Sequence, residues 1–328
     1  MPSGRFSALA DSLGLLGVLV LLVVLFGTLS DYFLTAVTLR TLLNQVPALT
    51  LVSIGMTYVL VIAGIDLSVG SVMALASGVL GYALIGASLT LPFAIVLALA
   101  TGLLCGLFNG GVTVGWSIPS FIVTLGMLEM ARGGAYLVTG SQTAYLGAAV
   151  EGIGNPVQVL GVSPAFIVAL VLVVLAQVVL SQTTFGRYMM AIGSNREAAR
   201  LSGIDSRKVE AAVFALSGML AGLAGVMHVG YLGSADPNAG IGLELSAIAA
   251  VVIGGTSLMG GRGSVVNAFF GVLIIAVLQV GLAQVGATEP TKRVLTGAVI
   301  VAAVILDAYR HRLAGRRYRL LGVLLRRK

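Results

Sequence analysis

Four polar side chains stand out because each lies within a long run of apolar residues. An amide or hydroxyl in such a place could bond a neighbouring helix, or it could hydrogen-bond a polar solute passing through. A carboxyl group there favours a functional role, since charged groups are costly in an apolar setting. The four candidates for lining a solute path are Asn44, Asp66, Asn109 and Thr124.

Asp66 lies in the segment "GIDLSVG" between two apolar runs, and it has two interpretations. The carboxylate could cap a helix that begins there, by accepting the N–H groups of residues 67–69. Alternatively, a broken helix could place the carboxylate where it pairs with a basic group, for which Arg262 is a candidate. The sequence alone leaves both interpretations open.

The remaining polar groups within apolar runs are expected to have structural roles. Glu129 and Arg132 are three residues apart, so they are expected to pair on one helix face. Gln177 and His228 are isolated, and satisfied roles in the core are expected for both.

The chain lacks the residue patterns of catalytic and nucleotide-binding sites. It contains no G-x-x-x-x-G-K-[ST] phosphate-binding loop and no G-x-S-x-G nucleophile motif. Its one cysteine, Cys105, and its two histidines have no metal-ligand spacing, so no metal site is expected. We therefore predict that the chain is not an enzyme and binds no cofactor of its own.

The segment "SNREAARLSG" over 194–203 is polar in a chain with few charges. Ser194 and Glu197 match a capping box, and Gly203 can take the positive φ that ends a helix. A helix of about two turns is therefore predicted over 195–202. Such a short helix is marginal in water by itself, so it is either an ordinary loop helix or a docking helix for a partner.

The composition indicates what surrounds these groups. Hydrophobic residues make up 58% of the 328 residues, charged residues 9%, and the mean hydropathy is +1.06. Soluble domains carry roughly 25% charged residues, so this surface suits a bilayer. We expect one all-α membrane domain over 1–328 with about ten transmembrane helices, some of them broken or half helices. The spans are about 12–30, 42–63, 68–88, 91–113, 118–138, 163–183, 209–230, 242–261, 263–283 and 292–308.

The basic residues are distributed asymmetrically across these spans. With the N-terminus in the cytoplasm, 15 of the 19 lysines and arginines fall on the inner side, as the positive-inside rule requires. They concentrate in a loop over 184–208 and in a tail over 309–328, which could also attract anionic lipid head groups. Both termini are therefore predicted to be cytoplasmic. The net charge of +7 reflects this topology, and no nucleic-acid partner is expected.

Two segments resemble each other within the chain. The segments "VIAGIDLSVGSV" over 61–72 and "VIGGTSLMGGRGSV" over 252–265 share a V-I-x-G start, a leucine and a G-S-V end. Transporters are often built from internal repeats, so these segments suggest an internal repeat, parallel or inverted.

The segment "EAARLSG" over 197–203 fits the E-A-A-x-x-x-G pattern in the cytoplasmic loop of bacterial ABC-importer permeases. Further segments resemble the ribose/monosaccharide branch of these permeases, within the branched-chain amino acid/sugar permease family. They occur in the same order within about 45–310: "AGIDLSVGS", "FNG", "IPSFIVTLGM", "RGGAYLVTG" and "AVVIGGTSLMGGRGS".

This resemblance implies that the loop over 184–208 holds a coupling helix, which sits in a cleft of an ATP-binding subunit. Small alanines would let the helix lie close in the cleft, Gly203 would end it, and Glu197 and Arg200 could pair at the partner's surface. The residues that the resemblance assigns to this coupling are Arg187, Asn195, Glu197, Ala198, Ala199, Arg200 and Gly203.

The resemblance also implies a function and a set of partners. The chain would be a multi-pass permease in the bacterial inner membrane, translocating a monosaccharide such as ribose or a related sugar. Its partners would be an ATP-binding subunit that holds ATP and Mg²⁺, a periplasmic sugar-binding protein, and a second permease chain in a homodimer or heterodimer. The alternative is an ion-coupled secondary transporter of a small polar solute, which would need intramembrane acids such as Asp66 or Glu129.

Overall fold

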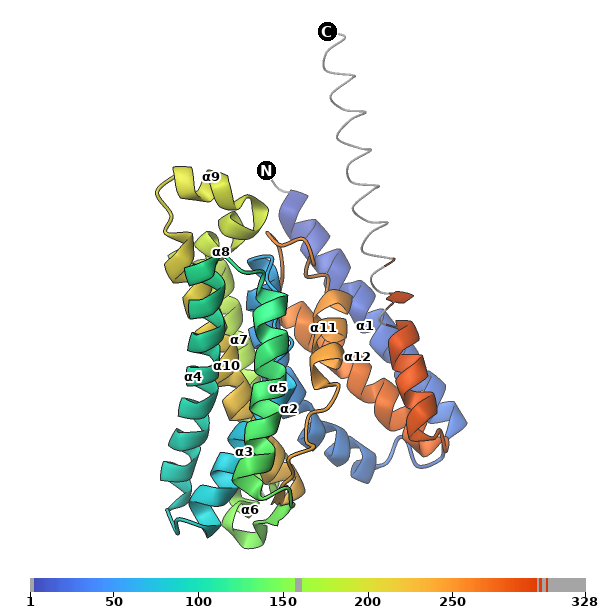
Figure 1. Cartoon of the computed structure of the whole chain (residues 1–328). Coiled ribbons are helices and arrows are strands. Elements are labelled where there is room, and N and C mark those ends of the chain that lie inside the picture. The colour runs from blue at the N-terminus through green and yellow to red at the C-terminus, as the bar shows by residue number, and fades with distance from the viewer. Residues whose placement is uncertain (1–2, 157–160, 300, 303–304, 306–328) are drawn as a thin grey trace.

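The computed structural model describes residues 3–156, 161–299, 301, 302 and 305. These residues form an all-α bundle, as the sequence predicts, with one short antiparallel strand pair (Figure 1). The elements are α1 (Ser3–Leu29), α2 (Ala36–Val61), α3 (Val69–Ile85), α4 (Leu91–Trp116), α5 (Ser120–Thr139), β1 (Ala144–Tyr145), η1 (Gly147–Ala149), α6 (Glu151–Gly154), α7 (Pro164–Gln182), α8 (Thr184–Ser194), α9 (Arg196–Leu201), α10 (Ser206–Leu232), β2 (Ser234–Ala235), α11 (Leu243–Ile253) and α12 (Val265–Gln284). Residues 289–299 are also helical.

Seven helices of the described chain are long and apolar enough to cross a bilayer, namely α1, α2, α4, α5, α7, α10 and α12. Large apolar side chains on their outer faces are exposed, as a surface in contact with lipid requires. The apolar helices α3 and α11 are shorter, and the predicted last span and the basic tail lie partly or wholly outside the described residues. The predicted count of ten spans therefore stays a prediction.

The span predicted over 242–261 is too long, because α11 ends at Ile253. Residues 254–264 form a glycine-rich loop in which Gly255, Gly260 and Gly261 take positive φ angles of 83°, 82° and 78°. This left-handed conformation ends a helix and favours glycine. The expectation of half helices is thus confirmed at α11.

A second break lies between α2 and α3. Residues 62–68 are non-helical, and Ala63 has a φ of 61°. The two breaks fall in the two similar segments of the sequence and touch each other: the Gly261 N–H donates to the Val61 carbonyl (2.9 Å).

α10 is the central helix, and it packs against α4, α2 and α3. Its contact with α4 is a crossing of backbones at glycines. A Cβ added at Gly102 would lie 2.2 Å from the Gly218 carbonyl oxygen, and one added at Gly106 would lie 2.2 Å from the Phe214 carbonyl oxygen. Glycines spaced four residues apart allow membrane helices to approach this closely.

The glycine crossing can be tested with two alanine substitutions in α4. We expect Gly106→Ala to lower the free energy of unfolding by about 1–3 kcal/mol, because the added methyl group overpacks the contact with α10. Gly111→Ala is the matched control, since a Cβ there meets nothing within 4 Å, and it should leave stability unchanged or slightly raised. Thermal unfolding of both purified variants in detergent measures the difference, and equal stabilities would contradict the crossing.

Candidate functional site

The short helix α9 lies at the end of the bundle where α1 begins, and α6 lies at the opposite end (Figure 1). The cap predicted at Ser194 is wrong by one residue. The Asn195 side chain caps α9 by accepting the Ala198 N–H (3.0 Å), whereas the Ser194 hydroxyl donates to the Met190 carbonyl within α8. The reason is that residues 184–194 form an amphipathic helix, α8, which sequence analysis treated as loop.

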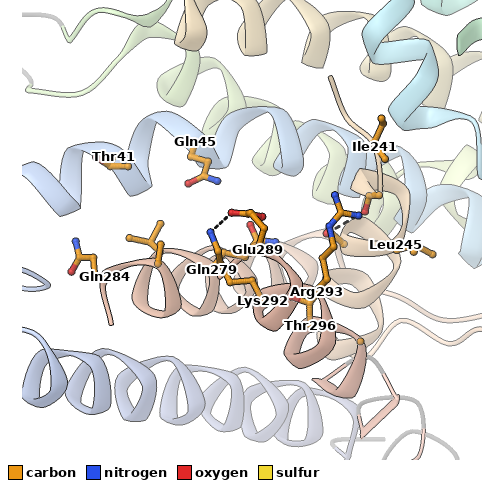
Figure 2. Close-up of a pocket in the computed structure, with 15 residues that line it drawn as sticks. Thr41, Gln45, Ile241, Leu245, Gln279, Gln284, Glu289, Lys292, Arg293 and Thr296 are labelled. Carbon is orange, nitrogen blue, oxygen red and sulfur yellow. Dashed lines mark hydrogen bonds and ion pairs between the residues drawn. The ribbon is translucent and has the colours of Figure 1, made fainter. Parts of the chain in front are cut away.

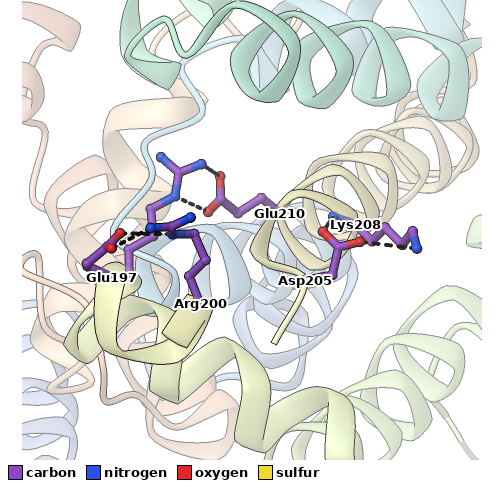
Figure 3. Close-up of polar contacts among 6 residues, drawn as sticks. Glu197, Arg200, Asp205, Lys208 and Glu210 are labelled. Atoms are coloured by element: carbon purple, nitrogen blue, oxygen red, sulfur yellow. Dashed lines mark hydrogen bonds and ion pairs between the residues drawn. The ribbon is translucent and has the colours of Figure 1, made fainter. Parts of the chain in front are cut away.

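The predicted end of this short helix is present, and the helix that follows it is also capped. Gly203 has a φ of 84°, and Asp205 caps α10 by accepting the Lys208 N–H (3.4 Å). Glu197 and Arg200 pair with each other on the exposed face of α9, with Arg200 Nη2 2.6 Å from Glu197 Oε1 (Figure 3). The hydrogen bond from Arg200 holds the pKa of Glu197 below its ordinary value, so the pair is ionised at neutral pH.

The two alanines of α9 face opposite ways. Ala199 is buried in the core of this chain, whereas Ala198 is exposed. Only Ala198 is therefore available to a partner, together with the exposed side chains of Glu197, Arg200 and, on α8, Arg187. A role of these residues in coupling stays a prediction.

An ion pair that sequence analysis missed joins α9 to the central helix. Arg196 donates to Glu210 through two nitrogens, Nε and Nη2, each 2.9 Å from a carboxylate oxygen (Figure 3). The Glu210 side chain is only 8% exposed, and the Arg196 side chain is 53% exposed. The sequence signal for this ion pair was an acid, Glu210, near the start of an apolar span. Its partner could not be read from the sequence, because Arg196 lies 14 residues away on another helix.

The end of α8 also abuts both breaks in the bundle. A Cβ added at Gly193 would lie 1.8 Å from the Val61 carbonyl oxygen and 2.5 Å from the Gly261 nitrogen. The backbones on either side of the loop helix are therefore in direct contact with the ends of α2 and of the loop after α11. A displacement of α9 would be transmitted to α10 by the ion pair and to these breaks by backbone contact.

Three of the four predicted path residues come together at the break between α2 and α3. The Asp66 carboxylate accepts the Ser68 hydroxyl (2.6 Å) and the Ser68 N–H (3.0 Å), and its other oxygen accepts the Ser217 hydroxyl of α10 (3.0 Å). Asn109 of α4 donates to the Ser68 hydroxyl (3.0 Å). All four side chains are buried.

Side chains of α5 satisfy the backbone of the same break. The Leu67 N–H donates to the Thr124 hydroxyl (3.1 Å), which also donates to the Ile65 carbonyl (3.2 Å). The Ile65 N–H donates to the Ser120 hydroxyl (2.9 Å). Within a bilayer a non-helical backbone is tolerated only where such partners exist, so this cluster holds the break in place.

These contacts give Asp66 neither interpretation in full. The carboxylate accepts one of the three N–H groups named for a cap, that of Ser68 directly before α3, and its partners among the described residues are Ser68 and Ser217 rather than Arg262. Asn44 lies apart from this cluster, half-buried on α2. That the four residues line a solute path stays a prediction.

The expected pairing of Glu129 with Arg132 is also wrong. Arg132 donates to the carbonyls of Pro237 and Ala239 (2.9 Å to Ala239), whereas Glu129 is exposed near the middle of α5 and makes no ion pair with the described residues. Gln177 has the expected structural role: it accepts the N–H of Val265 (2.8 Å) at the start of α12.

Apolar spans, buried breaks and one protruding loop helix define a multi-pass integral membrane protein. A model of the family described as branched-chain amino acid transport system / permease component matches residues 38–304. The chain is 38% identical to the ribose import permease protein of Escherichia coli (strain K12), over 88% of this chain and 91% of that one. It is 35% identical to the fructose import permease protein of Rhizobium meliloti, over 90% and 85%.

The D-allose transport system permease protein of Escherichia coli (strain K12) is 32% identical, over 92% of this chain and 93% of that one. The chain therefore belongs to this family of sugar ABC-importer permeases, and it is a transport component rather than an enzyme. No solved structure matches the chain.

The bonds of Thr124 to the break can be tested by removing one hydroxyl. We expect Thr124→Val to lower the free energy of unfolding by about 1–3 kcal/mol, because the buried Leu67 N–H loses its acceptor. The control Thr101→Val removes an exposed hydroxyl that bonds only its own helix, and it should have little effect. Thermal unfolding in detergent compares the two, and a stable Thr124→Val variant would contradict the role given to this cluster.

The link between α9 and α10 can be tested by a double-mutant cycle. Arg196→Ala should lower the free energy of unfolding by about 1.5–3 kcal/mol, because the Glu210 carboxylate stays buried without its partner. Adding Glu210→Gln should recover at least half of this loss, since the neutral amide is less costly to bury. Arg207→Ala, at an exposed arginine of the same loop, serves as the control. Additive effects of the two substitutions would show that the pair carries no coupling energy.

Proposed function

We propose that this chain is the membrane-spanning subunit of an ATP-driven importer that translocates a monosaccharide. The observation that carries the proposal is α9, a short capped helix with an exposed polar face, tied to the central helix by Arg196 and Glu210. Its relatives are named as ribose, fructose and D-allose permeases. Ribose and related sugars are therefore the substrates to test first.

In this proposal, α9 is the coupling helix and an ATP-binding subunit is its partner. The chain has no phosphate-binding loop, so ATP and Mg²⁺ would be held by the partner. When the partner closes on ATP, it would move α9. The ion pair to α10 and the contact of Gly193 with Val61 would carry this movement into the bundle.

The orientation follows from the same assignment. α9 would face the cytoplasm, and α1 begins at the same end of the bundle (Figure 1). The distribution of basic residues supports cytoplasmic termini as well. The opposite end, which carries α6 and the β1–β2 pair, would receive sugar from a periplasmic binding protein.

The exposed Glu129 supports a second permease chain. It lies near the middle of the membrane-spanning α5, on a face where a Cβ added at Gly126 or Gly133 meets nothing within 4 Å. A charged residue at the centre of a span costs roughly 2.5–3.5 kcal/mol in lipid. This face would therefore meet another chain or a water-filled path between two chains, in a homodimer or a heterodimer.

The ion-coupled alternative has less support. Asp66, its best candidate acid, is buried and bonded to two serines rather than open to an ion. Uptake driven by an ion gradient without any ATP-binding subunit would favour this alternative.

The proposal is tested with the chain, its co-expressed ATP-binding subunit and its binding protein in proteoliposomes. Vesicles with the wild-type chain should take up at least one of the labelled sugars, and only when ATP is present on the side of the membrane that holds the ATP-binding subunit. Glu197→Ala should reduce uptake at least tenfold while the chain stays inserted, because it removes the charge pair from the docking face of α9. Glu151→Ala alters an exposed acid at the opposite end of the bundle, and it should not uncouple ATP hydrolysis from uptake. If the Glu197→Ala variant takes up as much sugar per ATP hydrolysed as the wild type does, α9 is not the coupling helix.

A further inference from the structure

A polar cavity of about 620 Å³ lies between α2, α12, the start of α11 and the helical residues 289–297. Its polar lining comprises three glutamine amides, three hydroxyls and three charged groups, most of which are labelled in Figure 2. These are Gln45, Gln279, Gln284, Thr41, Ser246, Thr296, Glu289, Lys292 and Arg293. A volume of this size lies within the usual range of small-molecule sites, roughly 300–1,000 Å³.

A smaller cavity of about 240 Å³ continues the first one inward. The two share lining residues on three elements, among them Gln45 of α2, Ser246 of α11 and Gln279 of α12. The smaller cavity also reaches His228 on the central helix α10. Together they form a polar recess that extends from the end of α12 towards the core of the bundle.

The polar groups of this recess have unused hydrogen-bonding capacity. The amides of Gln45 and Gln279 make no hydrogen bond to the described residues, and neither does the ring of His228. Gln284 donates to the Thr38 hydroxyl (2.6 Å), but its Oε1 atom is buried and has no partner among the described residues. His228 was expected to have hydrogen-bond partners in the core. Its ring has none among the described residues, so that expectation is wrong.

Such groups are out of place at membrane depth unless something polar meets them. α2 and α12 are both long and apolar enough to be spans, and lipid offers an amide no hydrogen bond, so an unsatisfied amide there is costly. Gln45 points into the space from α2 (Figure 2), and Gln279 lines it from α12. Water or a polar solute is required to complete their bonding.

The lining matches a neutral solute with many hydroxyl groups. A primary amide offers donors and acceptors at once, and the hydroxyls of Thr41, Ser246 and Thr296 do the same. Glu289 pairs with Lys292, so Arg293 is the remaining charged group of the larger cavity, where its N–H groups can donate to hydroxyls. A charged substrate would meet no dedicated counter-ion in the inner cavity, whose polar side chains are two amides, a hydroxyl and an imidazole.

The recess lies on the side of the membrane away from α9. The loop before α12 contacts Gly193 at the end of α8, and α12 runs from there to Gln284, at the far end of the bundle. The recess is also distinct from the buried cluster of Asp66, Asn109 and Thr124, none of which lines it.

We propose that this recess is a binding site for a neutral sugar within a single permease chain, reached from the side opposite the coupling helix. Gln45 and Gln279 would hold the sugar hydroxyls between α2 and α12. The proposal rests on the proposed function for the identity of its ligand, and it adds the site at which that ligand is held.

Water access and sugar occupancy are tested first, with a cysteine placed in the recess. Ser246→Cys is made in a Cys105→Ala background, and the reconstituted protein is labelled with a water-soluble thiol reagent. We expect labelling, and we expect D-ribose, D-fructose or D-allose to slow it at least threefold. Thr101→Cys, at a partly exposed position of the span α4 outside the recess, is the control and should stay unlabelled. Absence of labelling at residue 246, or labelling that none of the three sugars slows, would overturn the proposal.

The two amides are tested with Gln45→Leu and Gln279→Leu. Both should lower sugar uptake in proteoliposomes at least tenfold, while ATP hydrolysis stimulated by the binding protein continues. Neither should lower the melting temperature, because each removes an amide without a partner. Wild-type uptake in both variants would overturn the role of the amides. If the wild-type chain transports none of the sugars, the proposed function is contradicted instead. The labelling of residue 246 measures water access and sugar binding in the recess without depending on transport.

Discussion

The constraint on which this structure depends is that lipid satisfies no backbone hydrogen bond. Every interruption of a helix must find its partners within the protein. Backbone groups of residues 62–68 find partners in Ser120 and Thr124 of α5 and in the Asp66 carboxylate, which is itself held by Ser217 of α10. The loop after α11 does so partly through the carbonyl of Val61. The two breaks are therefore stable parts of the bundle, and each lies against the other.

Glycine makes this arrangement compact. Between α4 and α10 it brings two backbones into contact, and at Gly193 it brings the end of α8 against both breaks. Close-packed backbones have little freedom to yield independently. If α9 is the coupling helix, as we propose, a force on it would be passed to the bundle as movement of whole elements, with the ion pair of Arg196 and Glu210 as the second link. The structure combines close-packed backbones next to α8 and α9 with a polar recess lined by α2 and α12.

Several features of the fold could be predicted from local patterns in the sequence. Runs of apolar residues indicated the spans, and Gly203, which takes a positive φ, marked the end of α9. Errors arose where two local signals competed. Ser194 fits a helix start by spacing, yet it belongs to the preceding amphipathic helix, so Asn195 caps α9 instead. Glu129 and Arg132 are spaced three residues apart, as an ion pair on a helix requires. Arg132 instead donates hydrogen bonds to backbone carbonyls more than 100 residues away in the sequence.

Composition, periodicity and motif spacing are local properties, so the sequence alone is enough to predict an all-α membrane protein that resembles the permease family and has a short helix in a polar loop. What each polar group contacts depends instead on the tertiary arrangement of the helices. The serines around Asp66, the partner of Glu210 and the recess between Gln45 and Gln279 all join residues distant in sequence. Such contacts depend on how the helices cross, and that is set by packing throughout the bundle rather than by any single segment.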